Sequence, residues 1–120
     1  MAIKISVIIS AYNSEKYIGR CLRSLLNQTA NIVQNNKYEI IVINDGSKDK
    51  TQFAIDLFKK PNDEKIITIQ NDKNIGLPAS LNKGIMKSKG KYIVRVDSDD
   101  YVNINFLSVL SFYLDSHKDS

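Results

Sequence analysis

The stretch that decides the fold is "IKISVIIS", residues 3–10, a largely apolar and β-branched run that ends at turn residues. A strand with one solvated face alternates apolar and polar residues, whereas a strand buried on both faces is apolar almost throughout. We therefore predict at 3–10 a buried strand of a parallel sheet. Three further runs predict strands of the same kind of sheet: "YEIIVIN" at 38–44, "KIITIQ" at 65–70 and "KYIVRV" at 91–96.

A helix is predicted between the first two strands, within residues 13–28. It carries one apolar stripe at helical spacing: Ile18, Cys21, Leu22, Leu25 and Leu26. Asn13 or Ser14 is expected to cap its start, and Glu15 is then favourably placed in the first turn. The polar segment 29–37, which follows, is predicted to be a loop.

Three more helices alternate with the remaining strands. One is capped by Ser47 or Asp49 and ends at Pro61-Asn62, and the next runs from about Pro78 to Ser88. The apolar side predicted for the first of these is Phe53, Ala54, Leu57 and Phe58. The side predicted for a last helix is Phe106, Val109, Leu110, Tyr113 and Leu114. The order β-α-β-α-β-α-β-α predicts an α/β fold, a mostly parallel sheet with helices on both faces.

The composition is that of a single globular domain, residues 1–120. The chain has 120 residues, of which 42% are hydrophobic and 25% charged. No apolar run approaches the about 20 residues that cross a bilayer, and the N-terminus lacks a signal-peptide pattern. The single cysteine, Cys21, is predicted to be a buried structural thiol, which suits the reducing cytoplasm.

The charge balance is mildly basic, and we interpret the lysines as solvated surface charges rather than as a binding surface. The net charge is +4 and the pI is about 9.1, which suits nucleotides or an anionic membrane face. The lysines, however, are scattered, and the sequence has no arginine-rich arm or basic stripe with aromatic residues. Nucleic-acid binding is therefore not indicated.

Polar and acidic residues follow every predicted strand. In a parallel sheet the carboxyl ends of the strands share one edge, and ligands bind there. The residues expected to meet at this edge are Tyr12, Asn13, Asp45, Asn71, Asp72, Asp97, Asp99 and Asp100. Turn geometry alone explains Gly46, Ser47 and Asn74, but it explains Tyr12 and the acidic cluster less well.

The acidic cluster "DSDD", residues 97–100, points to a divalent cation. The sequence has neither G-x-G-x-x-G after the first strand nor G-x-x-x-x-G-K-[ST], so the two familiar phosphate-binding loops are absent. Mg²⁺ or Mn²⁺, held by one or two carboxylates, is another way to neutralise a phosphate. In an extended segment Asp97 and Asp99 point the same way, while Asp100 is expected to cap the next helix. The alternative is a solvated turn in front of that helix.

These motifs together resemble the nucleotide-sugar-binding, N-terminal portion of a family 2 glycosyltransferase with the GT-A fold. The resemblance covers nearly the whole chain, from "ISVIISAYNSEKYIGRCLRSLLNQT" through "YEIIVINDGSKDKT" and "NDKNIGLPASLNKGI" to "GKYIVRVDSDDYV". It implies transfer of a sugar, with inversion, from a nucleoside diphosphate to an acceptor in glycan or cell-surface polysaccharide synthesis. The acceptor, the sugar and the nucleotide stay open.

The resemblance also implies roles for particular residues. "SAYN" stands at the family's P-x-Y-N-like segment, so Ala11, Tyr12 and Asn13 belong to the nucleotide site, with Tyr12 against the base. The other residues implied for nucleotide-sugar binding are Glu15, Asp45, Asn71, Asp97 and Ser98. "DSD" matches the D-x-D motif, in which Asp97 and Asp99 hold the divalent metal, Mn²⁺ or Mg²⁺, that bridges the diphosphate.

Two positions depart from the family's pattern. Ser10-Ala11 replaces a segment that usually contains proline. Leu81 stands where many members carry arginine, and a leucine supplies no cationic contact to a phosphate. Lys83 or Arg95 could take over that contact, and the sequence does not choose between them.

The family's general base is an Asp or Glu well downstream of D-x-D, so we expect it beyond residue 120. The acidic or imidazole groups near the end, Asp115, His117 and Asp119, are not expected to be the base. We therefore expect a truncated domain with an exposed sheet edge, through which the chain self-associates. The parent protein is expected to associate peripherally with a membrane. Two alternatives stay open: a non-catalytic fragment that binds nucleotide sugars or packs on a partner, and a Mg²⁺-dependent α/β phosphatase-like domain.

Overall fold

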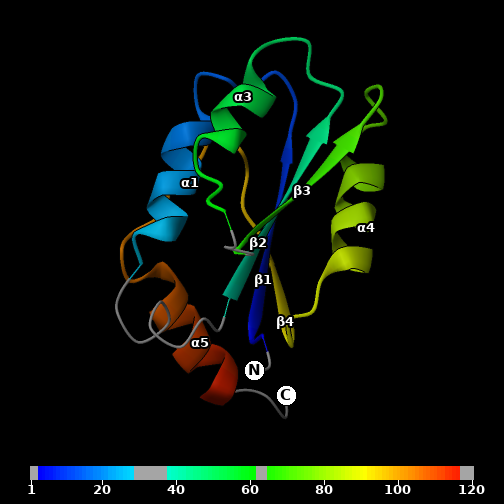
Figure 1. The fold of residues 1–120 in the computed structure, drawn as a ribbon. Helices are drawn as coiled ribbons and strands as arrows, with labels where there is room; N and C mark the ends of the chain where they lie inside the picture. Colours follow the sequence, from blue (N-terminus) through cyan, green and yellow to red (C-terminus); the bar gives the residue numbers. More distant parts are fainter. Residues whose placement is uncertain (1–2, 29–37, 62–64, 117–120) are drawn as a thin grey trace.

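A computed structural model of the chain describes residues 3–28, 38–61 and 65–116 (Figure 1). Strands and helices alternate along these residues as predicted, and the predicted loop at 29–37 lies outside them. The elements are β1 (Ile5–Ala11), α1 (Ile18–Leu26), β2 (Tyr38–Asp45), α3 (Thr51–Asp56), β3 (Ile66–Asn71), α4 (Leu77–Lys87), β4 (Tyr92–Arg95) and α5 (Phe106–Ser116).

The four strands of the described residues form one sheet in the order β3-β2-β1-β4, and every neighbouring pair is parallel. Ile8 of β1 pairs with Ile41 of β2 on one side and with Arg95 of β4 on the other. All carboxyl ends consequently lie at one edge of the sheet, where polar side chains were expected to meet. The predicted fold class is confirmed.

Helices cover both faces of this sheet, with α1, α3 and α5 on one side and α4 on the other (Figure 1). Successive side chains of a strand point to opposite faces. Accordingly Val7 and Ile9 of β1 belong to the larger core cluster with Leu22 of α1, while Ile8 belongs to a smaller cluster against which Leu81 of α4 packs. A central strand with two buried faces needs an apolar residue at most positions, which explains why five of the seven residues of β1 are apolar.

The apolar stripe of α1 is confirmed, but its predicted start is wrong. Ile18, Cys21, Leu22 and Leu25 are fully buried, whereas the N-cap is Tyr17, with no side-chain capping bond. The side-chain oxygens of Asn13 and Ser14 do not cap α1 because they have other partners. Asn13 Oδ1 accepts the Lys48 N–H, and Ser14 Oγ bonds to Ser98 Oγ.

The predicted helix around Phe53 is shorter and rotated relative to expectation. It ends at Asp56 rather than near Pro61, and it buries Thr51 and Ile55 while Phe53 is exposed. The N-cap is Lys50 without a side-chain bond, although Asp49 Oδ1 accepts the Thr51 N–H. Ala54 and Phe58 of the predicted side are partly buried against the core, whereas Phe53 and Leu57 are exposed.

The same correction applies to α5. Leu107 and Ser111 are its buried residues, while Val109 and Tyr113 of the predicted face are exposed. Phe106 of the predicted face is partly buried against the core, and the Leu107 N–H donates to Gln28 Oε1. Asp100 was expected to cap this helix, but α5 begins six residues later, at Phe106, so this prediction is wrong.

Two predictions from the composition can be compared with the structure. Cys21 is fully buried, as expected for a structural thiol. Among the residues described, none of the helices has the length and apolar character that a bilayer crossing requires. β3 and β4 are the outer strands of the described sheet, and self-association through such an edge stays a prediction.

The helix α4 lies unusually close to the sheet at Gly84. A Cβ at this position would stand 2.6 Å from Ile8 Cγ2 and 2.8 Å from Ile43 Cδ1. By contrast, a Cβ at Gly19 of α1 would meet nothing closer than 3.7 Å, at Phe58. Gly84 thus allows one helix to cover both β1 and β2.

We predict that Gly84→Ala destabilises the protein, because the added methyl overpacks the Ile8–Ile43 contact. The expected loss is about 1–3 kcal/mol of unfolding free energy, measured by urea denaturation. Gly19→Ala is the matched control, and it should be neutral or stabilising by up to about 1 kcal/mol, since alanine favours the helix. Equal stability of the two variants would contradict the close approach of α4.

Candidate functional site

A polar pocket lies where β1, β2 and β3 end. Its volume is about 430 Å³, and Tyr12, 45% exposed, contributes an aromatic ring to it. The other lining residues are Asn44, Gly46, Ser47, Lys48, Gln52, Gln70, Asn71, Asp72, Lys73 and Asn74. Gly46 (φ 71°) lets the turn after β2 touch the loop after β3, because a Cβ there would lie 2.4 Å from Asn74 N.

Asp45, at the end of β2, is buried beneath this pocket region and supports the loop before α4. It is 2% exposed and accepts three N–H groups: Asn71 Nδ2 at 2.9 Å, the backbone of Ile75 at 2.8 Å and the backbone of Gly76 at 3.0 Å. Burial raises the pKa of the Asp45 carboxyl, but the hydrogen bonds from Ile75, Asn71, Gly76 and Ser80 outweigh it and hold that pKa below its ordinary value. Asp45 is therefore a charged acceptor at neutral pH.

Asn71 connects this buried acid to the pocket. Its Nδ2 also donates to Ser80 Oγ at 3.1 Å, and its Oδ1 accepts Lys83 Nζ at 2.7 Å. With every polar atom of its amide bonded, Asn71 holds a fixed orientation at the wall of the pocket. Lys83 is thus engaged at Asn71 rather than free for a phosphate.

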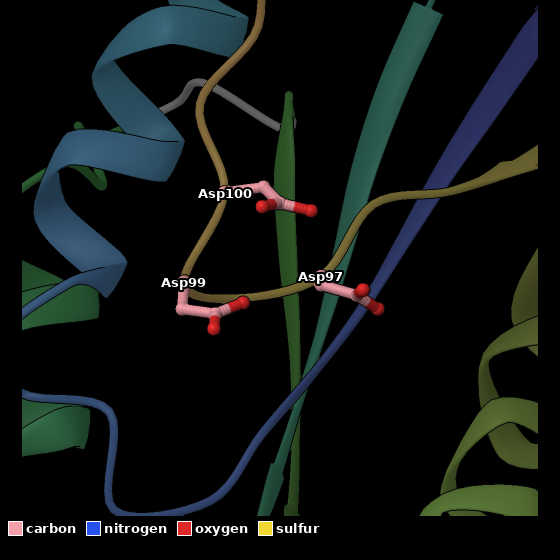
Figure 2. A group of neighbouring side chains, drawn as sticks. All are labelled: Asp97, Asp99 and Asp100. Atoms are coloured by element: carbon pink, nitrogen blue, oxygen red, sulfur yellow. The ribbon is translucent and has the colours of Figure 1, made fainter.

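Three exposed carboxylates stand close together on the carboxylate loop, residues 97–101, between β4 and α5 (Figure 2). One ligand oxygen each from Asp97, Asp99 and Asp100 lies within 4.8 Å of the others. The loop is not extended as predicted but turned, because the Asp100 N–H donates to the Asp97 C=O at 3.0 Å. The turn brings in Asp100 as a third carboxylate.

Arg95 already contacts one of these acids. Its Nε and Nη2 lie 3.1 and 2.9 Å from Asp97 Oδ1. Both side chains are about half exposed, so the pair contributes little to stability. A cation at the loop would compete with Arg95 for this oxygen.

The polar ridge of α1 consists of Arg20 and Ser24 on the helix and of Gln28 two residues beyond its end. These three residues bind the backbone from the carboxylate loop to α5. Arg20 Nη2 donates to the Asp99 C=O at 3.0 Å, and Ser24 Oγ accepts the Val102 N–H at 3.0 Å. Gln28 donates to the Asn103 C=O at 2.9 Å and accepts the Leu107 N–H at 2.8 Å. The irregular segment therefore has its backbone groups paired by α1.

Cys21 and Ser14 add two contacts to the same loop. Burial, together with the charges of Asp100, Asp99 and Asp97, raises the pKa of the Cys21 thiol to about 12, so the thiol stays protonated. Its Sγ lies 3.6 Å from the Asp97 C=O, to which it donates. Ser14 Oγ lies 2.9 Å from Ser98 Oγ and joins the end of β1 to the carboxylate loop.

A family model described as "Glycosyl transferase family 2" matches residues 6–120. The chain belongs to this family. The resemblance seen in the sequence motifs is thereby confirmed, and glycosyltransferases are the class of enzyme to which this domain is assigned.

Curated relatives carry glycosyltransferase names. The chain is 43% identical, over 100 residues, to a poly(ribitol-phosphate) beta-glucosyltransferase of Bacillus spizizenii, covering 82% of this chain and 15% of the relative. It is 37% identical, over 106 residues, to glycosyltransferase GlyG of Streptococcus pneumoniae, covering 88% of this chain and 33% of the relative. The chain spans a third or less of the length of these relatives.

Solved structures confirm the GT-A fold. The crystal structure of S. aureus TarS 1-349 in complex with UDP-GlcNAc superposes with a TM-score of 0.85 at 32% identity, over 97% of this chain and 32% of that one. The mannosyltransferase PcManGT from Pyrobaculum calidifontis shares the fold with a TM-score of 0.83 at 21% identity, over 95% and 33% of the two chains.

The structure gathers only some of the predicted family 2 site residues. Tyr12 and Asn71 line the pocket, and Asp97, Asp99 and Asp100 form the acidic cluster. The remaining predicted residues lie outside the lining of that pocket: Ala11, buried in the core; Asn13, whose Oδ1 accepts the Lys48 N–H; Glu15, exposed; Asp45, buried; and Ser98, bonded to Ser14.

Sequence reasoning missed Lys48 and Lys73 in the pocket, and the polar ridge of α1. The lysines were treated as scattered surface charges, because a loop lysine carries no periodic signal. The ridge did have a signal: polar residues recur at positions 20, 24 and 28, beside the apolar stripe of the predicted helix. Polar residues at that spacing beside a buried helix face indicate a second contact surface, although the helix itself ends at Leu26.

We predict that Asp45→Asn destabilises the protein and that the effect depends on pH. An amide places an NH₂ group against one of the three donors, which costs about 1–3 kcal/mol. Because the folded-state pKa of Asp45 lies below the ordinary 3.8, its contribution is present above that pH and is lost as the pH falls through the folded-state pKa. The difference between the two proteins should therefore persist from neutral pH down to the ordinary pKa of 3.8 and narrow only below it, as measured by urea denaturation from pH 7 to about pH 2.

The control is Asp72→Asn, which removes the same charge from an exposed residue of the pocket wall. It should leave the unfolding free energy unchanged at neutral pH. A pH-independent difference for Asp45→Asn, or a similar loss for Asp72→Asn, would count against the structural role of Asp45.

Proposed function

We propose that this chain is the donor-binding part of a glycosyltransferase that binds a nucleoside-diphosphate sugar with Mg²⁺ or Mn²⁺ and transfers the sugar, with inversion, to an acceptor hydroxyl. The observation that carries the proposal is the polar pocket with Tyr12 and the three-carboxylate cluster at one sheet edge, linked through the Ser14–Ser98 contact. A nucleoside diphosphate has an aromatic base at one end and anionic oxygens at the other. The pocket with Tyr12 suits the base, and a cation at the carboxylate cluster suits the diphosphate.

The pocket supplies what a nucleoside needs. Tyr12 offers an aromatic surface to the base, and Asn44 and Asn71 offer amide groups at the wall. Lys48 and Lys73 add positive charge for phosphate oxygens. Asp45 orients Asn71, and a carboxylate has about four acceptor sites, so a direct bond from the base to Asp45 stays a prediction.

The carboxylate cluster fits a hard divalent cation. The oxygens of Asp97, Asp99 and Asp100 lie within 4.8 Å of one another, and Mg²⁺ in proteins is usually held by one or two carboxylates together with substrate phosphates, so these residues would hold the metal. The metal would stabilise the negative charge on the leaving diphosphate as a Lewis acid. Arg95 would then be released from Asp97, and we propose that it contacts a phosphate oxygen.

The general base is proposed to come from a part of the full protein outside this chain. Within the described residues Asp115 pairs with Lys4, and His117 and Asp119 lie outside those residues. The solved relative TarS binds UDP-GlcNAc, and two relatives act on poly(ribitol-phosphate) by name. We therefore propose a UDP-sugar first, and a cell-surface polymer as the acceptor class, with the reaction in the cytoplasm at a membrane surface.

A non-catalytic domain that binds nucleotide sugars is the competing proposal. It shares the pocket and the carboxylate cluster but lacks turnover. Steady release of free nucleotide by the full-length protein, given UDP-sugars and hydroxyl acceptors, decides against it. The phosphatase-like alternative loses its basis, because the chain belongs to a glycosyltransferase family and β1 ends at Ala11 without a carboxylate.

We predict metal-dependent nucleotide binding that requires the carboxylate cluster. Calorimetry with UDP, GDP and dTDP should show binding of at least one of them, strengthened by Mn²⁺ and weakened by chelation. Asp99→Asn removes a full ligand charge and should lower the metal-dependent affinity by at least about tenfold, or about 1.4 kcal/mol.

The control for charge is Asp56→Asn, because Asp56 is an exposed acid of α3 that is absent from the acidic cluster. It should bind nucleotide and metal like the unmodified protein. If no nucleotide binds in the presence of Mn²⁺, the donor-binding proposal for this chain fails.

We predict that Tyr12 recognises the base by stacking. Tyr12→Ala should weaken UDP binding by about 5- to 150-fold, since stacking of a base on an aromatic side chain contributes about 1–3 kcal/mol. Tyr12→Phe keeps the ring and should retain most of the affinity. An equal loss in both variants would show that the hydroxyl, and not the ring, makes the contact.

A further inference from the structure

Arg20 of α1 contacts the carboxylate loop without neutralising it. Its Nη2 donates to the Asp99 C=O at 3.0 Å, and its guanidinium carbon lies 4.5 Å from the centre of the Tyr101 ring. Within the described residues it forms no ion pair with any of the three carboxylates, and the cation that does so is Arg95. The Arg20 guanidinium therefore contacts a backbone carbonyl and an aromatic ring of this loop rather than its carboxylates.

The position of this loop needs outside support. Three exposed like charges within 4.8 Å repel one another, and this repulsion favours a more open loop. The turn itself has one internal hydrogen bond, from the Asp100 N–H to the Asp97 C=O. Arg20 contacts the residues on both sides of Asp100, namely Asp99 and Tyr101. These two contacts oppose an opening of the loop.

We propose that Arg20 is a positioning residue for the divalent-cation site: it holds Asp99 and Tyr101 so that the three carboxylates converge. The inference rests on the proposed function, which makes this loop a metal site. Arg20 then has two opposite effects on a bound cation. Its charge repels a divalent ion, whereas its grip on the loop assembles the ligands.

These opposite signs make the proposal testable by one titration. If Arg20 acted only through its charge, Arg20→Ala would tighten Mn²⁺ binding. If it positions the loop, Arg20→Ala weakens Mn²⁺ binding despite the lost repulsion. Arg23 is the matched control, because it is an exposed arginine of the same helix and lies over the Phe58 ring at 5.8 Å.

The experiment measures free Mn²⁺ by electron paramagnetic resonance in titrations of the 120-residue chain. Arg20→Ala should lower the Mn²⁺ affinity at least about fivefold, whereas Arg23→Ala should leave it unchanged or slightly raise it. Arg20→Lys keeps the charge but loses the planar guanidinium that bonds to the backbone and stacks on the Tyr101 ring. Its Mn²⁺ affinity should therefore lie between those of the unmodified protein and Arg20→Ala. Equal or tighter Mn²⁺ binding by Arg20→Ala overturns the proposal.

A metal-free measurement separates this proposal from the proposed function. In Arg20→Ala, amide hydrogen exchange should accelerate at Asp100 and at Val102, whose N–H groups bond to the Asp97 C=O and to Ser24 Oγ. Arg23→Ala should not change it. If the unmodified chain binds no Mn²⁺, the metal role fails while exchange still tests the positioning. Unchanged exchange in Arg20→Ala overturns the positioning role.

Discussion

The constraint on which the site depends is the backbone that runs from the end of β4 into the first turn of α5. Before α5 it forms no helix or strand, so its N–H and C=O groups need other partners. The polar ridge of α1 supplies them: Arg20, Ser24 and Gln28 bond in turn to backbone groups of Asp99, Val102, Asn103 and Leu107. The apolar stripe of the same helix is fixed against the sheet. The helix α1 therefore fixes the position of the carboxylate loop relative to β1 and β2.

This arrangement leaves the carboxylates themselves available. Because the neighbouring side chains bind main-chain atoms of the loop, the carboxylates of Asp99 and Asp100 stay exposed, and Asp97 shares one oxygen with the half-exposed Arg95. A loop held by its own acidic side chains would have no ligands to offer. The protonated Cys21 thiol follows the same rule, since it contacts the Asp97 C=O and not a carboxylate.

The sequence predicted the sheet well because a central parallel strand needs apolar residues at most positions, and β1 has them at five of its seven positions. It predicted the acidic cluster for a partly wrong reason: the loop is turned rather than extended, and Asp100 joins the cluster instead of capping α5. It misplaced the buried sides of α3 and α5, because their apolar residues, such as Phe53 and Val109, occur on several sides and only tertiary contacts choose among them. The α1 ridge was overlooked since its targets are backbone groups, which carry no residue identity.

The aspartates at this sheet edge have different roles because their surroundings differ. Asp45 is buried and surrounded by N–H donors, so its charge is already balanced by the protein and its role is to fix Asn71 and the loop before α4. Asp99 and Asp100 are exposed and have acidic neighbours, so their charge is balanced by solvent or by a cation. A bound cation is therefore stabilised most by carboxylates that accept no hydrogen bonds from the protein. Burial and donor count, more than the spacing of acidic residues, separate the acid that supports the site from the acids that can bind.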